Sequence, residues 1–167
     1  MATNSTIYTW LEGFEEGVAD IYFGFHQKFI QNPRLAKFWM EAALEELQHT
    51  SILRFCCENQ LFSPVEINKT DTGRVTEMFE MVNVLANAPD LTVDLTFFAA
   101  LIMESSGIEK IFRQLIQALA ANHYVLYTAI EGSLRSHHEA FAQAALAFAD
   151  DPALANSFRN LSNDLSL

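Results

Sequence analysis

The chain has 167 residues, half of them hydrophobic, and it carries 21 acidic against 10 basic residues, a formal net charge of −11. A chain of this length suits one domain with a core of its own. An acidic protein without a local basic patch does not bind a polyphosphate backbone, which argues against nucleic acid as a partner. The longest apolar run, 95–103, is about half of what a membrane-spanning helix needs.

Composition also bears on location and assembly. The first residues, Met-Ala-Thr-Asn-Ser-Thr, lack the basic and apolar regions of a signal peptide. The two adjacent cysteines, Cys56 and Cys57, match neither a disulfide framework nor a CxxC site. We therefore expect a soluble cytoplasmic protein that binds no membrane. Only 19% of the residues are charged and fourteen are Phe, which indicates that some apolar surface lies in an oligomer interface. We expect a homodimer.

Apolar residues recur at every third or fourth position along most of the chain, the period of amphipathic helices. Asn32 can cap a helix and Pro33 suits a first turn, so one helix ends and the next begins there. The pattern predicts four long helices and a short terminal helix, over 7–31, 33–58, 92–121, 123–149 and 152–160. The predicted fold class is all-α.

The lengths of the connections predict the topology. One or two residues separate the first two long helices, and the same holds for the last two, so each pair forms an antiparallel hairpin. The segment 60–91 between the hairpins is long and contains a short predicted helix over 72–85. A connection of that length lets the third long helix start at the opposite end of the bundle. Two hairpins joined by one long crossover form the ferritin-like four-helix bundle.

Acidic and imidazole side chains interrupt the apolar stripes of all four long helices. Buried carboxylates are costly unless they are paired or bound to a metal. A Glu-x-x-His motif places an oxygen and a nitrogen ligand one turn apart on one face, and a bundle brings four such faces to one cation site. The predicted metal ligands are Glu15, Glu46, His49, Glu104 and His138. Glu45 and His137 fall off the predicted stripes, and we expect them to be solvated.

An internal repeat supports this site. Glu15 precedes Glu46 by 31 residues, and Glu104 precedes position 135 by the same spacing. A histidine follows three residues later in each half, at His49 and His138. The two halves therefore offer the same arrangement of ligand positions.

Over about 15–148, the sequence resembles the rubrerythrin-like branch of the ferritin-like di-iron carboxylate proteins. In that family each half offers a Glu and a later Glu-x-x-His, and the second Glu bridges two metals. A Tyr seven residues past the first Glu is also common there, and Tyr22 matches it. The resemblance implies one or two iron ions, with manganese or zinc as other candidates, and an oxidoreductase that reacts with oxygen or peroxide.

The sequence departs from the family at the second bridging position, which is Arg135. An inward Arg135 would leave a ligand charge that one divalent ion neutralises, and its guanidinium would fill the second metal position. Alternatively, a π-bulge would swing Glu131 or Glu139 inward and restore the carboxylate. Gly107 replaces an extra Glu of rubrerythrin, and the paired CxxC motifs of its rubredoxin-like centre are absent, so peroxidase activity is not carried over.

Two function classes follow from these residues. The first is a metal-binding oxidoreductase. The alternative is a metal-free degenerate bundle in which Arg135 pairs with Glu46 and Glu104, and which acts as a dimeric binding or scaffold module. Iron storage is a weaker third hypothesis, because nothing in the sequence points to a cage or a mineral-nucleating surface.

Overall fold

The structure, a computed structural model, describes residues 4–61, 69–106, 117, 119 and 122–164. Within these ranges the regular structure is helical, which confirms the all-α prediction, and no helix there combines the length and apolarity needed to cross a bilayer. The helices are α1 (Asn4–Lys28), α2 (Pro33–Glu58), α3 (Lys69–Ala86), α4 (Val93–Glu104), α6 (Tyr124–Phe148) and α7 (Pro152–Asp164).

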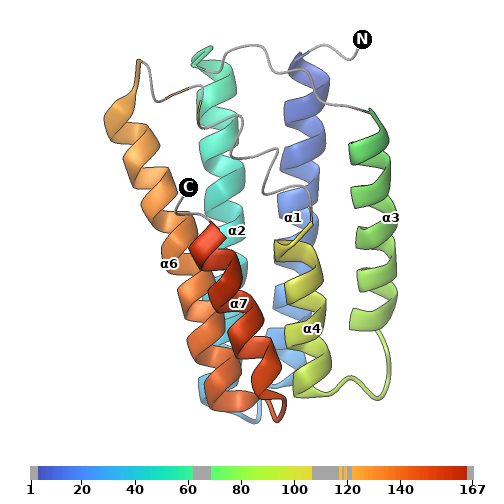
Figure 1. Ribbon diagram of the computed structural model, residues 1–167. Coiled ribbons are helices and arrows are strands. Elements are labelled where there is room, and N and C mark those ends of the chain that lie inside the picture. The colour runs from blue at the N-terminus through green and yellow to red at the C-terminus, as the bar shows by residue number, and fades with distance from the viewer. Residues whose placement is uncertain (1–3, 62–68, 107–116, 118, 120–121, 165–167) are drawn as a thin grey trace.

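The helices run nearly side by side along one axis (Figure 1). α2 returns alongside α1, and α3 then runs back along the other side of α1, so that α4 begins at the same end as α2. α4 packs against α3, α6 and α7, and α6 packs against α2 and α7. The long segment after α2 therefore carries the chain back along the length of the bundle, as its length predicts.

Local signals explain where α1 ends and α2 begins. α2 begins and ends at the predicted residues, and the side chain of Asn32 accepts a hydrogen bond from the Leu35 N–H at 3.3 Å. α1 ends at Lys28 rather than at 31, because the next residues form the turn that reverses the chain. α4 ends at Glu104, and the part of the predicted third long helix over 107–116 lies outside the described residues.

Two apolar clusters fill the interior at different levels. The first contains a group of packed aromatic rings, among them Tyr22, Trp39 and Phe141, whose ring centroids lie 5.4–6.0 Å apart. The other includes Leu11 and Leu134. Along α1, α2 and α6, the acidic and imidazole side chains lie between residues of the first cluster and residues of the second, and Glu104 ends α4 directly after Met103 of the first cluster. The polar centre is therefore enclosed by apolar side chains on both sides along the bundle axis.

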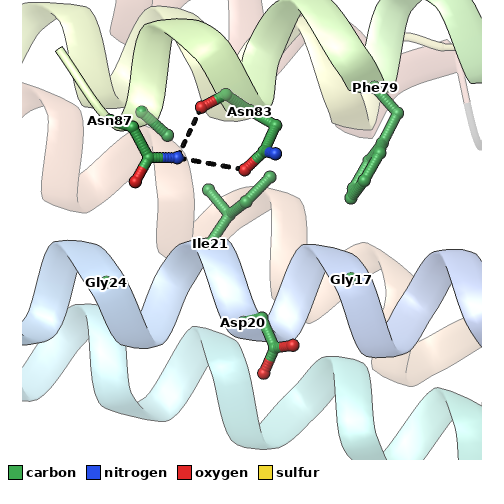
Figure 2. A pocket seen from close by; sticks show the side chains of 8 residues that line it. Gly17, Asp20, Ile21, Gly24, Phe79, Asn83 and Asn87 are labelled. Carbon is green, nitrogen blue, oxygen red and sulfur yellow. Dashed lines mark hydrogen bonds between the residues drawn. The ribbon is translucent and has the colours of Figure 1, made fainter.

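α3 approaches α1 closely at Gly17. Figure 2 shows Phe79 reaching from α3 toward this glycine, and a Cβ at Gly17 would lie only 2.5 Å from the Phe79 Cζ. A hollow of about 330 Å³ lies beside this contact and is bordered by Asn83 and Asn87. The carboxylate of Asp20 points away from α3, so the hollow is lined by apolar groups, amides and helix backbone.

Candidate metal centre

One group of possible ligands joins α1 to α2. Glu15, Glu46 and His49 are all buried, and their ligand atoms lie within 4.8 Å of one another. The Nδ1 atom of His49 lies 3.2 Å from Oε2 of Glu46 and 3.8 Å from Oε2 of Glu15. Ligand atoms lie about 2.1 Å from a first-row divalent ion, so atoms up to roughly 4.2 Å apart can share one ion. Small side-chain movements would let these three residues hold a metal.

A second group joins α2 to α4 and α6. Its members are Glu46, Glu104 and His137, and the Nε2 atom of His137 lies 3.2 Å from a carboxylate oxygen of each glutamate. His138 lies at the margin of this group, with its Nε2 atom 3.4 Å from Oε2 of Glu104. Glu46 belongs to both groups, because its Oε2 faces His49 and its Oε1 faces His137. A carboxylate placed in this way can bridge two ions.

A carboxylate outside the group contacts the other nitrogen of His137. Oε2 of Glu45 lies 2.6 Å from Nδ1 of His137, and the Glu45 side chain is 44% exposed whereas that of His137 is 2% exposed. An imidazole that donates from Nδ1 to a carboxylate keeps its Nε2 lone pair for a metal, and such partners fix the orientation of ligand histidines. Glu45 therefore positions His137 toward Glu46 and Glu104.

Tyr22, a member of the first apolar cluster, holds Glu104 by a hydrogen bond. Its hydroxyl donates a hydrogen bond to Oε1 of Glu104 at 2.7 Å, and its ring is fully buried. Burial and the neighbouring Glu104 carboxylate raise the pKa of Tyr22 well above its ordinary value. Tyr22 therefore keeps its proton and remains a donor to that carboxylate.

The buried charges shift one another's pKa values. Burial raises the pKa of Glu15 to about 8. Burial opposes ionisation of Glu46 as well, but His49 and His137 beside it bring its pKa below the ordinary value. His137 similarly holds the pKa of Glu104 well below normal against the effect of burial. Despite burial, Glu46 raises the pKa of His49 to about 10. Without a metal, the protonated His49 and His137 balance the ionised Glu46 and Glu104, and Glu15 stays neutral because it keeps its own proton.

The prediction that Arg135 points inward is wrong. Arg135 is exposed, whereas Leu134, His137 and His138 on the same helix are buried. Each residue of an α-helix advances about 100°, which turns Arg135 about 110° away from the centre of the buried stripe. The guanidinium therefore fills no metal position, and the expected Arg135 network with the buried glutamates does not form.

The alternative, a π-bulge that turns Glu131 or Glu139 inward, is not found in α6 either. α6 is a continuous α-helix over its described length, from Tyr124 to Phe148. Glu139 is exposed and accepts a hydrogen bond from Nε2 of Gln143, while Glu131 is half-buried. Neither glutamate belongs to a candidate ligand group among the described residues. Their place is taken by His137, which we had expected to be solvated.

Most predicted site residues converge. Glu15, Glu46, His49 and Glu104 all belong to the two groups, His138 contacts Glu104, and Tyr22 donates to Glu104. The predictions missed His137 and Glu45. The sequence does contain a signal that His137 is buried. His137 follows Leu134 by three residues and precedes Phe141 by four, so the helical period places it on the same face as these two apolar residues.

Comparison of the sequence with protein-family models and with curated proteins found no match, and comparison of the structure with solved structures found none either.

Proposed function

We propose that this protein binds two divalent ions, iron or manganese, in the buried carboxylate–histidine centre and acts as an oxidoreductase on dioxygen or peroxide. The observation that carries the proposal is the shared carboxylate of Glu46, whose two oxygens face His49 and His137 at 3.2 Å each. Glu15 and His49 would complete one ion's ligands. Glu104 and His137 would complete those of the other, with His138 beside them.

The donor atoms fit such ions. They are carboxylate oxygens and imidazole nitrogens without a thiolate, a set that suits iron and manganese and that zinc also accepts. Oε1 of Glu46 is buried and accepts no hydrogen bond from the described residues. A buried acceptor without a donor calls for an explanation, and a cation supplies one.

The proposal includes the rubrerythrin-like family and its ferritin-like arrangement of helices. Support comes from α1, α2, α4 and α6, each of which supplies a side chain to the centre, and from the long connection after α2. Gly107, where the sequence departs from rubrerythrin, lies outside the described residues.

The protein's own groups would prepare the centre for this chemistry. Tyr22 holds Glu104 through its hydroxyl, and Glu45 holds His137 through Nδ1. The two apolar clusters keep bulk water from reaching the centre along the bundle axis and strengthen the electrostatic interactions within it. Iron or manganese, once bound, would supply the electrons that reduce dioxygen or peroxide.

The alternative function is a metal-free bundle that acts as a binding or scaffold module. One observation favours it: a protonated His137 hydrogen-bonds to Glu104 and lies at ion-pair distance from Glu46, 3.2 Å in each case, so the buried charges balance without an ion. His137 then has the role that the sequence assigned to Arg135.

A homodimer is also part of the proposal. Leu44, Leu47 and Phe55 lie exposed along the outward face of α2, and the Ser51 hydroxyl between them bonds back to the Leu47 carbonyl at 2.9 Å. Two copies of an acidic chain repel one another wherever their carboxylates meet, so an uncharged face favours a second copy of this chain. Sedimentation equilibrium of the protein and of Leu44→Glu tests this, with the dimer expected only for the unchanged chain.

Metal analysis tests the proposed function directly. Protein purified without oxygen from cells supplied with iron and manganese should contain about two ions per chain, and Glu46→Gln should contain almost none. Glu139→Gln, which removes an exposed carboxylate bonded to Gln143, serves as the matched control. The iron-loaded protein should oxidise when dioxygen or peroxide is added, whereas zinc-loaded protein should not react. Less than about a tenth of an ion per chain would favour the metal-free alternative.

A further inference from the structure

The proposed centre has one open side. The side chains of Glu15, Glu46 and His49 are 7%, 4% and 6% exposed. On the other side Glu104 is 13% exposed and Glu45 is 44% exposed. Solvent therefore meets the centre where α2 faces α4 and α6.

His137 joins this open side to the interior. Its Nδ1 atom lies 2.6 Å from the exposed Glu45, and its Nε2 atom lies 3.2 Å from both Glu46 and Glu104. The ring thus contacts the surface carboxylate and the buried carboxylates at the same time. The Glu46 oxygen that it faces, Oε1, is buried and accepts no hydrogen bond from the described residues.

The surface where α1 meets α2 carries an arginine. Arg54 lies 3.4 Å from the exposed Glu16 and 3.8 Å from the half-buried Glu12, so its guanidinium offsets one of the two negative charges that neighbour Glu15 along α1. A guanidinium stays charged and repels cations. The Glu45 carboxylate has no such neighbour among its described ion pairs, where its partner is the imidazole of His137.

We propose, on the basis of the proposed function, that divalent ions enter the centre through Glu45. The carboxylate of Glu45 attracts the ion at the surface and offers it a first oxygen ligand. The ion then passes the His137 ring, whose movement exchanges its contacts with Glu45, Glu46 and Glu104 for the ion, and reaches Glu104 and Glu46.

The rate of metal uptake tests this route. Metal-free protein is mixed rapidly with Co²⁺, whose absorption reports its coordination. In Glu45→Gln the amide oxygen can still accept a hydrogen bond from His137, so the substitution removes chiefly the charge. Uptake should slow about three- to tenfold at low ionic strength, and the difference should shrink in salt. The number of ions bound at saturating Co²⁺ should stay the same, because the amide oxygen still holds His137.

Two substitutions serve as controls. Glu41→Gln removes a carboxylate that is 57% exposed, one turn earlier on α2, where it pairs with Lys37 at 2.9 Å. Glu16→Gln removes a carboxylate on the side that Arg54 covers. Both should take up Co²⁺ at the rate of the unchanged protein, since both remove the same charge away from the entrance. Circular dichroism verifies that all variants fold.

The outcomes separate this inference from the proposed function. If the unchanged protein binds no Co²⁺ at all, the proposed function fails. If it binds Co²⁺ but Glu45→Gln takes up the ion at the same rate, or Glu16→Gln is slowed as strongly, the Glu45 route is overturned. A loss of ions bound at saturating Co²⁺ in Glu45→Gln would also overturn it, because Glu45 would then act on the binding of the ion through His137 rather than on its passage.

Discussion

The Nε2 atom of His137 lies 3.2 Å from Oε1 of Glu46, and the other oxygen of that carboxylate lies 3.2 Å from Nδ1 of His49. One side chain of α2 therefore faces nitrogen ligands from α6 and from its own helix. Because His49 follows Glu46 by one turn, the α2 pair needs only a regular helix, whereas the His137 contact depends on how α6 packs against α2.

The shared position of Glu46 predicts unequal effects on metal content. Glu46→Gln should lose both ions, because each candidate group includes this carboxylate. Glu15→Gln should lose only the ion on the α1 side, since Glu15 belongs to one group. Metal analysis after equilibrium dialysis measures both. Equal losses in the two variants would contradict the division into two groups.

Tyr22→Phe removes the hydroxyl that donates to Glu104 at 2.7 Å and leaves the buried ring in place. Hydrogen bonds to charged groups contribute about 1.5–3 kcal/mol, so the free energy of unfolding should fall by that amount. For a chain of this size the expected drop in Tm is about 3–10 °C, measured by calorimetry. Tyr127→Phe, on the half-buried α6 surface, is the control and should change Tm much less.

As pH rises, the free energy of unfolding of the metal-free protein should fall, whereas the additional stabilisation by a bound metal should grow. Folded Glu15 keeps its proton to about pH 8, against an ordinary pKa of 4.5, so the free energy of unfolding falls as pH rises through that window. The stabilisation from protonated His49 is complete below its ordinary pKa of 6.5 and is lost as pH rises through about 10. The lowered pKa of Glu46 and of Glu104 contributes stability above 4.5 that is lost in acid.

The metal-free protein should therefore be most stable at mildly acidic pH and lose stability toward alkaline pH. Metal must displace protons from Glu15, His49 and His137, so the stabilisation by Mn²⁺ should grow over the same range. Thermal melts between about pH 5 and pH 9, in chelator and in Mn²⁺, measure both slopes. A rise of Tm with increasing pH in chelator would contradict the proton balance of the buried groups.

The sequence predicted the helical class, the bounds of α2 and the convergence of Glu15, Glu46 and His49, because these depend on local periodicity and spacing. The predicted inward orientation of Arg135 was wrong. That prediction came from aligning the two halves of the repeat residue by residue, whereas burial on α6 follows the helical period through Leu134 and Phe141. The contact between Glu45 and His137 joins residues far apart in the chain, and no local pattern encodes which half-exposed side chain meets a neighbouring helix.

Arg135 and His137 should respond very differently to the same change. Arg135→Leu alters an exposed side chain and should shift the free energy of unfolding by no more than about 0.5 kcal/mol. His137→Leu leaves two buried carboxylates without their shared partner and should cost about 3–5 kcal/mol in the metal-free protein. Urea unfolding measures both. A large loss in Arg135→Leu would revive the buried guanidinium network.

The close approach of α3 to α1 predicts opposite effects at two glycines. Gly24→Ala meets no atom within 4 Å and should stabilise the protein by about 0.5–1 kcal/mol, because alanine favours the helix. Gly17→Ala makes the same local gain, but its Cβ would lie 2.5 Å from the Phe79 ring. Moving that ring should cost about 1–3 kcal/mol, so the net effect is destabilising.

A double-mutant cycle isolates the contact with Phe79. Phe79→Leu shortens the side chain that faces Gly17, so in that background Gly17→Ala should approach the stabilising effect of Gly24→Ala. Chemical unfolding of the four combinations gives the coupling free energy. If Gly17→Ala remained as destabilising beside Leu as beside Phe, the ring would not be the obstacle. The packing of α3 on α1 would then need another explanation.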